Sequence, residues 1–345
     1  MKLTVDLLFD PPSFGNDKDV SIAHPADGRS AKSIKKPRVI GKGTFSTVLR
    51  LKGNAVKVVG VRHSQMLERE YKMLKRLEGC RNIVRAFNVS HRQGKESFLV
   101  MEDGGRDIFD ALPYLSADDK VFTYLQVSHA LEYMHERNVV HLDLKIDNVV
   151  IDAARRVRIV DFGLARLLTT EECTTRTLSD IVGSPSYACP EMLRAHTYNG
   201  FEADSWSMGV FVFVLWHNSM MWITAATSDD ARFAAFEKYV AAAGADVLSS
   251  TYLQRYEICR IAETPAWVWH VVNAALVIDP ERRRRRWSTS LGATIGGGRD
   301  SERTPKAALR SELDEVASMR CSSGGLHHTP VTSSTSGGCS RLPSK

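Results

Sequence analysis

The stretch His141-Leu142-Asp143-Leu144-Lys145-Ile146-Asp147-Asn148 is followed, thirteen positions after its last residue, by Asp161-Phe162-Gly163. The first stretch holds an acid, a cation and an amide close together, and the second adds another acid. Phosphoryl transfer needs such groups: an acceptor for a hydroxyl proton, a positive charge for the phosphate and oxygen ligands for a metal ion. Apolar runs such as Val149-Val150-Ile151 flank both stretches, so each is expected to lie beside a short buried strand that holds it in place.

The composition indicates a globular protein of the cell interior. A chain of 345 residues with 43% hydrophobic and 25% charged residues is long enough to bury a sizeable core. Its six cysteines lack CxxC spacing, which indicates reduced thiols and no zinc site. The N-terminus lacks the long apolar run of a signal peptide. The most apolar window, Trp206 to Trp216, is shorter than the roughly 20 residues that span a bilayer, so we expect a buried core helix and no transmembrane segment.

The hydrophobic patterns divide the chain into four parts. Residues 1–37 show no periodicity and are expected to form a loosely structured extension. Residues 38–103 read as a small lobe of four or five strands and one helix, with strand-like runs at 39–40, 48–51, 55–59 and 98–101 and a helical period over 66–77. Residues 104–286 read as a larger helical lobe, with helices expected at about 118–136, 204–216, 229–242 and 264–278. Residues 287–345 are rich in Ser, Gly and Arg and are expected to be a disordered tail.

A glycine turn near the start of the small lobe is a candidate phosphate-binding loop. Gly41 and Gly43 allow the backbone to approach a phosphate closely, and free N–H groups there can donate to its oxygens. The following run, residues 48–51, reads as a returning strand, whereas a dinucleotide-binding loop would open a helix. Alone, this signal is weak.

Taken together, these motifs resemble the eukaryotic protein-kinase family. Further matches are Gly183-Ser184-Pro185-Ser186-Tyr187-Ala188-Cys189-Pro190-Glu191, Asp204-Ser205-Trp206-Ser207-Met208-Gly209 and Asp279-Pro280-Glu281-Arg282-Arg283. The resemblance spans about residues 38–286. It implies a two-lobed α+β fold that binds ATP and Mg²⁺ and transfers the γ-phosphoryl group to Ser or Thr hydroxyls of protein substrates. The Ser184 hydroxyl favours Ser/Thr specificity, and the wording of these motifs leans toward the calcium/calmodulin-kinase-like branch.

The resemblance also implies roles for particular residues. Asp143 would accept the substrate hydroxyl proton, and Lys145 would neutralise the γ-phosphate. Lys57 would pair with the α- and β-phosphates and needs a helix carboxylate, for which Glu70 is preferred over Glu68. The magnesium ligands would be Asn148 and Asp161, and the nucleotide site would further include Gly41, Lys42, Gly43, Val48, Ala55, Met101, Glu102 and Asp107, with Met101 bordering adenine and Asp107 facing the ribose.

Three more expectations concern the support of this site. Asp204 would brace the backbone of the catalytic loop, and Arg283 would pair with Glu191 in a buried bridge. Ser46 stands where a third loop glycine is usual, and Leu142 stands where most family members have Arg. That arginine normally pairs with a phosphorylated residue of the activation segment, residues 161–191, so its absence weakens the case for regulation by this route.

Two other functions are alternatives to an active kinase. The first is a pseudokinase, a binding or scaffold protein on the same fold, which usually lacks the strand lysine, the catalytic aspartate or the metal aspartate; all three are present here. The second is a nucleic-acid-binding protein that uses its basic tail. The arginine run 282–286 is expected to be solvated surface, with binding to nucleic acid or to an acidic surface less favoured. We expect a cytoplasmic protein and leave a nuclear location open; substrate, subfamily, upstream regulation, oligomeric state and the role of the tail stay open as well.

Overall fold

The computed structural model describes residues 37–92, 94–175, 177–194, 197–226, 230–243 and 264–283. The expected N-terminal extension before residue 37 and the expected C-terminal tail lie outside these residues. So do the last three arginines of the basic run, Arg284 to Arg286.

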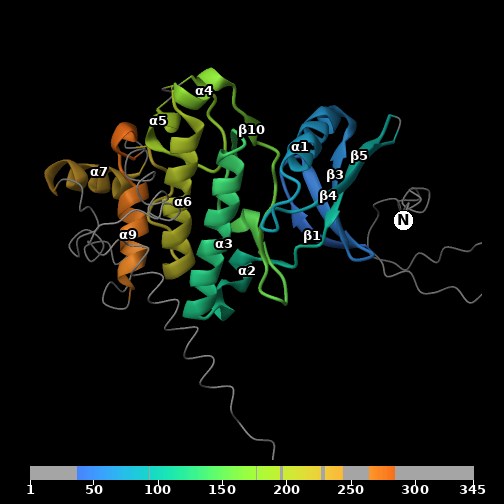
Figure 1. The fold of residues 1–345 in the computed structure, drawn as a ribbon, viewed down its shortest axis with the longest axis horizontal. Helices are drawn as coiled ribbons and strands as arrows, with labels where there is room; N and C mark the ends of the chain where they lie inside the picture. Colours follow the sequence, from blue (N-terminus) through green and yellow to red (C-terminus); the bar gives the residue numbers. More distant parts are fainter. Residues whose placement is uncertain are drawn as a thin grey trace, which may run out of the picture. The chain divides into compact units, whose positions relative to one another are not determined.

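The smaller lobe is built on a five-stranded antiparallel sheet with the strand order β1-β2-β3-β5-β4 (Figure 1). Its strands are β1 (Arg38–Lys42), β2 (Ser46–Leu51), β3 (Asn54–Gly60), β4 (Ala86–His91) and β5 (Glu96–Glu102). Lys52 and Gly53 form a two-residue hairpin loop between β2 and β3, and both have positive φ, as the tight turns matched to strand twist require. The strand runs expected from the sequence are confirmed, and β4 is a further strand outside those runs.

Helix α1 (Ser64–Arg76) packs against β4 and β5. Its buried residues are Leu67, Glu70 and Leu74, which share one face at helical spacing. The predicted helix over 66–77 is therefore confirmed with a slightly earlier start. A buried carboxylate in an otherwise apolar stripe requires a partner, because an unpaired charge is costly away from water.

The larger lobe is mostly helical (Figure 1). Its helices are α2 (Ile108–Ala111), α3 (Ala117–His135), α4 (Thr170–Thr174), α5 (Pro190–Leu193), α6 (Gly200–His217), α7 (Ala231–Ala243) and α9 (Ala266–Ala275). Two small sheets carry the loops of interest: β6 (Arg106–Asp107), β8 (Val149–Ile151) and β9 (Val157–Ile159) form one, while β7 (Val139–Val140) and β10 (Arg166–Leu167) form the other. The four long helices expected from the sequence are all present, so the two-lobed α+β fold is confirmed.

Helix α6 lies in the centre of the larger lobe and is buried on all sides from Glu202 to Leu215. It packs closely against α9, where a Cβ atom at Gly209 would lie 2.6 Å from the Cβ of Ala275. The expectation of a buried core helix over Trp206 to Trp216 is confirmed. Among the described residues, no helix is both long and apolar enough to cross a membrane.

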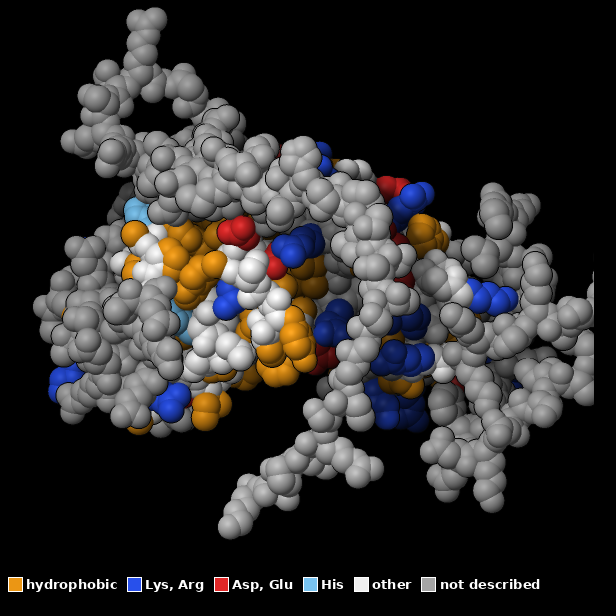
Figure 2. Space-filling view, turned by 90° about the horizontal axis from the view of Figure 1, so that it is seen from below, with side chains coloured by type: hydrophobic (Ala, Val, Ile, Leu, Met, Phe, Trp, Pro, Cys, Tyr) orange, Lys and Arg blue, Asp and Glu red, His pale blue; other side chains and the backbone are white. Residues whose placement is uncertain are grey.

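The loop before β4 joins the two lobes. The amide of Val84 donates to the carbonyl of Ile159 on β9 at 3.0 Å, and the amide of Ile159 donates to the carbonyl of Asn82 at 2.9 Å. Because β9 ends at Ile159, two residues before Asp161, these bonds fix the position of Asp161 relative to the sheet of the smaller lobe. On the face drawn in Figure 2, hydrophobic side chains gather over the helical part, and Lys and Arg gather toward the sheet.

Candidate active site

Lys57 lies at the centre of the first cluster of charged side chains. Its Nζ is 2.7 Å from Oε2 and 3.0 Å from Oε1 of Glu70, and 2.7 Å from Oδ1 of Asp161. Glu68, the rejected alternative, points elsewhere and bonds Nε2 of His91 at 2.7 Å near the surface. The structure thus brings together a strand, a helix and a loop through one ammonium group.

Burial and charge act against one another in this cluster. Burial lowers the pKa of Lys57, but the charges of Glu70 and Asp161 outweigh it and hold that pKa above its usual value. Burial raises the pKa of Asp161, yet the adjacent Lys57 outweighs it and the pKa lies below its usual range. For Glu70 burial prevails, so its pKa is raised despite the contact with Lys57. Two carboxylates that share one ammonium group give the cluster a net negative charge, which suits a site that receives a metal cation.

The backbone of the catalytic loop, residues 141–148, is held by hydrogen bonds to Asp204 on α6. The carboxylate of Asp204, which is fully buried, accepts the amides of His141 and Leu142 at 2.8 Å each and bonds Nε2 of His135 at 3.0 Å. Leu142 has a φ of 63°, a conformation that non-glycine residues adopt only where surrounding contacts impose it. The expectation that Asp204 braces this backbone is confirmed.

A second network surrounds Asp143. Its Oδ1 accepts the amide and the hydroxyl of Ser184 at 2.9 Å each, and its Oδ2 accepts Nζ of Lys145 at 2.8 Å and Nδ2 of Asn148 at 3.0 Å. Lys145 also donates to the Ser184 hydroxyl at 2.8 Å. At Gly183, where φ is +79°, a Cβ atom would lie 2.4 Å from the carbonyl oxygen of Leu142. Glycine at this position therefore lets the activation segment reach the catalytic loop.

The donor set near Asp161 fits magnesium. The Asn148 amide nitrogen is engaged by the backbone oxygen and the carboxylate of Asp143, so its carbonyl oxygen is the atom left for a metal. The Asp161 side chain is half exposed. Magnesium is commonly held by one or two carboxylates together with phosphate oxygens rather than by an all-protein cage. The described part of the chain contains no cluster of three His, Cys, Asp or Glu that could hold a metal alone.

The expected nucleotide residues of the small lobe share one face of its sheet. Val48 pairs with Lys57 across β2 and β3, and Ala55 pairs with Met101 across β3 and β5. Cross-strand partners point to the same side, so all four side chains lie together with the ammonium of Lys57. Three others, Gly41, Lys42 and Gly43, lie where β1 ends and the turn into β2 begins, and the Gly43 amide closes that turn on the Ser46 carbonyl at 2.8 Å.

The connection between the lobes uses two of the predicted side chains structurally. The Glu102 carboxylate pairs with Nε of Arg158 at 2.9 Å and accepts the Arg85 amide at 3.0 Å. The Asp107 carboxylate caps α2 by accepting the Asp110 amide at 2.7 Å. For Glu102, any contact with adenine would therefore fall to its backbone groups.

Arg50 is a residue that the sequence analysis did not single out. From β2 its guanidinium reaches the Asp103 carboxylate at 2.8 Å and the Gly105 carbonyl at 2.7 Å. It thereby ties the connection between the lobes to the sheet. An arginine in an alternating strand gives no signal of this contact, because solvent-facing strand positions carry the same residue type.

The activation segment is held by contacts that the sequence did not reveal. Arg166 pairs with Asp180 at 2.8 Å. The Asn199 side-chain nitrogen donates to the carbonyls of Glu172, Cys173 and Thr175 at 3.1, 3.3 and 3.1 Å. An Asn directly before a helix indicates an N-cap, and Asn199 does cap α6, but its second role depends on the fold.

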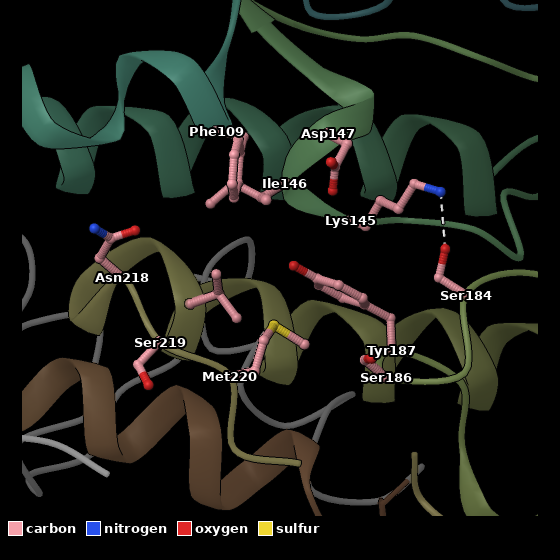
Figure 3. Close-up of a pocket in the computed structure, with 11 residues that line it drawn as sticks. Phe109, Lys145, Ile146, Asp147, Ser184, Ser186, Tyr187, Asn218, Ser219 and Met220 are labelled. Atoms are coloured by element: carbon pink, nitrogen blue, oxygen red, sulfur yellow. Dashed lines mark hydrogen bonds between the residues drawn. The ribbon is translucent and has the colours of Figure 1, made fainter. Parts of the chain in front are cut away.

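A groove of about 380 Å³ begins at the Asp143 network (Figure 3). In Figure 3 the catalytic loop and α2 form one wall, and the end of α6 with the segment around Tyr187 forms the other. The residues that line it are Phe109, Lys145, Ile146, Asp147, Ser184, Ser186, Tyr187, Val214, Asn218, Ser219 and Met220. Lys145 and Ser184 connect it directly to Asp143, so the groove is suited to a segment that brings a hydroxyl to that carboxylate.

The described arginines of the basic run have structural partners. Arg283 is fully buried, pairs with Glu191 at 2.7 and 3.2 Å and stacks over the ring of Trp206. The expected bridge between Arg283 and Glu191 is confirmed. Arg282 lies 3.5 Å from Asp279.

Comparison with known proteins gives a consistent picture. The family model described as "Protein kinase domain" matches residues 34–285. Over 196 residues the chain is 32% identical to NUAK family SNF1-like kinase 2 of Rattus norvegicus, covering 52% of this chain and 30% of that protein, and 31% identical to the Homo sapiens protein of the same name. Over 155 residues it is 35% identical to the probable serine/threonine-protein kinase MARK-A of Dictyostelium discoideum, covering 44% of this chain and 14% of the relative. The chain thus spans less than a third of the length of these relatives.

Proposed function

The chain belongs to the protein kinase family, and from that premise we propose that it is an active serine/threonine kinase, which transfers the γ-phosphoryl group of ATP to Ser or Thr hydroxyls of proteins. The observation that carries the proposal is the joint assembly of two networks. Lys57 contacts both Glu70 and Asp161, while Asp143 contacts Lys145, Asn148 and Ser184. A protein that used this fold only for binding would not need both.

The two networks supply the parts of a phosphoryl transfer. Asp143 accepts the hydrogen bond and then the proton of the acceptor hydroxyl, whose oxygen attacks the γ-phosphorus while the bond to the β-phosphate oxygen breaks. Lys145 offsets charge on the transferred group, and Lys57 orients the other phosphates. Asn148 and Asp161 would hold Mg²⁺, which when bound would supply positive charge to the phosphate oxygens. The groups are held in place before the reaction, which is the main source of rate in such sites.

Radiolabelled ATP with casein as acceptor tests the proposal. Asp143→Asn keeps the shape of the side chain but cannot accept the proton, and we expect a loss of about a few hundredfold in transfer rate, since one preorganised group contributes about 3 to 4 kcal/mol. Nucleotide binding, followed separately, should persist in the variant. Phosphoamino-acid analysis should show phosphoserine or phosphothreonine.

The binding-only alternative makes the opposite prediction. If wild type and Asp143→Asn incorporate equal label while both bind ATP, the chain is a pseudokinase and the proposal fails. The proposal also fails if label appears on tyrosine alone, because that result would overturn the Ser/Thr specificity inferred from Ser184.

We also propose that the protein acts in the cytoplasm on protein substrates. The six cysteines without CxxC spacing support this location. Fluorescence imaging of a tagged chain in cells tests it, and exclusive accumulation in the nucleus or secretion into the medium would contradict it.

A further inference from the structure

Ile223 has an environment that is unusual for a large apolar residue. Its side chain is 78% exposed, although the residues on both sides of it in the chain are integrated into the fold. Trp222 is fully buried among Trp206, Phe233 and Phe236, with ring centroids 4.9 to 5.9 Å apart. Isolated apolar residues on a surface need no explanation, so the case for Ile223 rests on how it is held and on what lies beside it.

The backbone of Ile223 is fixed from both sides. Its amide donates to Oδ2 of Asp230 at 2.6 Å, and its carbonyl accepts the hydroxyl of Ser186 at 2.6 Å. The indole of Trp222 adds a bond to the Ser186 carbonyl at 3.2 Å. The isoleucine side chain therefore projects from a backbone position whose amide and carbonyl are both hydrogen-bonded.

The same bonds tie Ile223 to the acceptor site. Ser186 is two residues from Ser184, which bonds both Asp143 and Lys145. Ser186 and Ser184 also line the groove of Figure 3. Because the Ser186 hydroxyl donates to the Ile223 carbonyl, a polypeptide that passes Ser186 on its way to Asp143 would also pass the residue that carries the exposed isoleucine side chain.

Part of the groove lining is apolar and suits apolar side chains of a substrate. Its walls include Phe109, which is 58% exposed, together with Ile146, Val214 and Met220. Asp147 is its single carboxylate among the lining residues. A contact between the Ile223 side chain and an apolar substrate residue would bury additional apolar surface of the substrate, and it would not depend on opposite charges.

We propose that Ile223 is a specificity-determining residue, which selects substrate polypeptides with an apolar side chain close to the phosphorylated Ser or Thr. The inference rests on the proposed kinase function and deepens it. The occupant is the substrate segment, because the Ile223 carbonyl is hydrogen-bonded to Ser186, which lies two residues from Ser184, a contact of Asp143. Ile223 does not touch the reacting atoms, so its effect should appear in substrate affinity and sequence preference rather than in the chemical step.

The test compares three variants of the full chain. Ile223→Ser removes the apolar side chain, Ile223→Leu keeps it, and Val61→Ser removes a similar aliphatic side chain, 53% exposed, from the smaller lobe. A library of Ser-containing peptides first defines which flanking position favours apolar residues in the wild type. Matched peptides with Leu or Ser at that position then give kcat and KM for each variant, alongside KM for ATP.

We expect Ile223→Ser to raise KM for the Leu peptide by about tenfold, as for the loss of an apolar contact in a specificity pocket, with kcat and KM for ATP unchanged. The preference for Leu over Ser should disappear in this variant, remain in Ile223→Leu and remain in Val61→Ser. Because the side chain is exposed, the melting temperature should not move.

Three results would overturn the inference. They are an unchanged KM and peptide preference in Ile223→Ser, an equal effect of Val61→Ser, and a change of oligomeric state in Ile223→Ser, which would assign the side chain to contact with a second copy. Each presupposes a wild type that phosphorylates peptides. If the wild type transfers no label at all, the proposed function fails and not this assignment alone.

Discussion

At the scale of single residues, Glu70 is a buried carboxylate whose position depends on its pairing with Lys57. It is an acid buried on the apolar face of α1, and the structure gives it one cation, Lys57, at 2.7 Å. Burying a carboxylate is unfavourable unless it is paired and hydrogen-bonded. Its position therefore makes sense only as the support that aims Lys57 at Asp161 and at a nucleotide.

Exchanging Glu70 for Gln tests this role, with Glu68→Gln as a matched control on the same helix. Glu70→Gln removes the charge that holds Lys57, and we expect kcat/KM to fall by about ten- to a hundredfold, since hydrogen bonds to charged groups contribute about 1.5 to 3 kcal/mol. Glu68→Gln removes a surface pair with His91 and should leave the rate within about twofold, because such pairs contribute little. Steady-state kinetics with a peptide substrate give both values. Equal effects of the two substitutions would contradict the assignment.

At the scale of elements, the activation segment is ordered by the protein's own contacts. The Arg166–Asp180 pair, the Asn199 bonds to three carbonyls and the contacts of Ser184 with Asp143 hold it at successive points. Leu142 offers no charge to a phosphate. The segment is thus held by contacts to its carbonyl and carboxylate groups. In a kinase regulated by phosphorylation, a phosphoryl group on the activation segment provides such contacts.

We expect the kinase to keep its activity after treatment with a broad-specificity phosphatase. Its rate should stay within about twofold of the untreated protein, because the cation of Arg166 already has a carboxylate partner. Mass spectrometry should verify removal of phosphate, and the phosphatase must be removed before the assay. A loss of about tenfold or more that is restored by rephosphorylation would contradict this expectation.

Asn199→Asp separates the two roles of this residue. The carboxylate keeps the oxygen that caps α6 but lacks the nitrogen that donates to the carbonyls of Glu172, Cys173 and Thr175. We expect α6 to remain intact, while the amides of α4 exchange faster with solvent, because each hydrogen bond lost from Asn199 to these carbonyls contributes about 0.5 to 1.5 kcal/mol of local stability. Hydrogen exchange with mass spectrometry measures both. Unchanged exchange in α4 would show that Asn199 serves only as a cap.

At the scale of the whole molecule, the Glu191–Arg283 bridge connects the end of the activation segment with the residues that follow α9. Arg283 also donates to the carbonyls of Val277 and Glu202, so one buried guanidinium joins segments far apart in sequence. Burial raises the pKa of Glu191, but Arg283 outweighs it and holds the pKa below its usual range. Such a pair is costly to break, because the remaining charge is left without a partner.

The bridge predicts how stability depends on pH. A carboxylate with a lowered folded-state pKa contributes stability above its unfolded-state pKa of about 4.3, and this contribution is lost as the pH falls toward the folded-state value. We expect the wild type to lose unfolding free energy on acidification below about pH 4.3 more steeply than Glu191→Gln, which has no group to protonate there. At pH 7 the variant should be less stable by about 3 to 5 kcal/mol.

Urea unfolding followed by tryptophan fluorescence, repeated between neutral and acidic pH, measures this dependence. Glu171→Gln, an exposed position on α4, is the control and should follow the wild-type slope. If Glu191→Gln also follows it, the bridge is not the source of the acid sensitivity.

Much of this protein follows from local sequence. The catalytic loop, the glycine turn, the strand lysine and the long helices were predicted because each depends on residues near one another in the chain, where periodicity and turn chemistry act directly. The preference for Glu70 over Glu68 and the pairing of Arg283 with Glu191 both came from the resemblance to the kinase family.

Tertiary structure alone decided the contacts that no local pattern encodes. Arg50 reaches Asp103 and Gly105, which lie more than fifty positions away, and Asn199 reaches back to the carbonyls around α4. Ile223 is exposed beside Ser186 although its neighbour Trp222 is buried. The sequence determines which groups are present and which elements carry them, but the side chain that meets a distant partner, or meets solvent, depends on how those elements pack, because the energy of burial is shared among residues far apart along the chain.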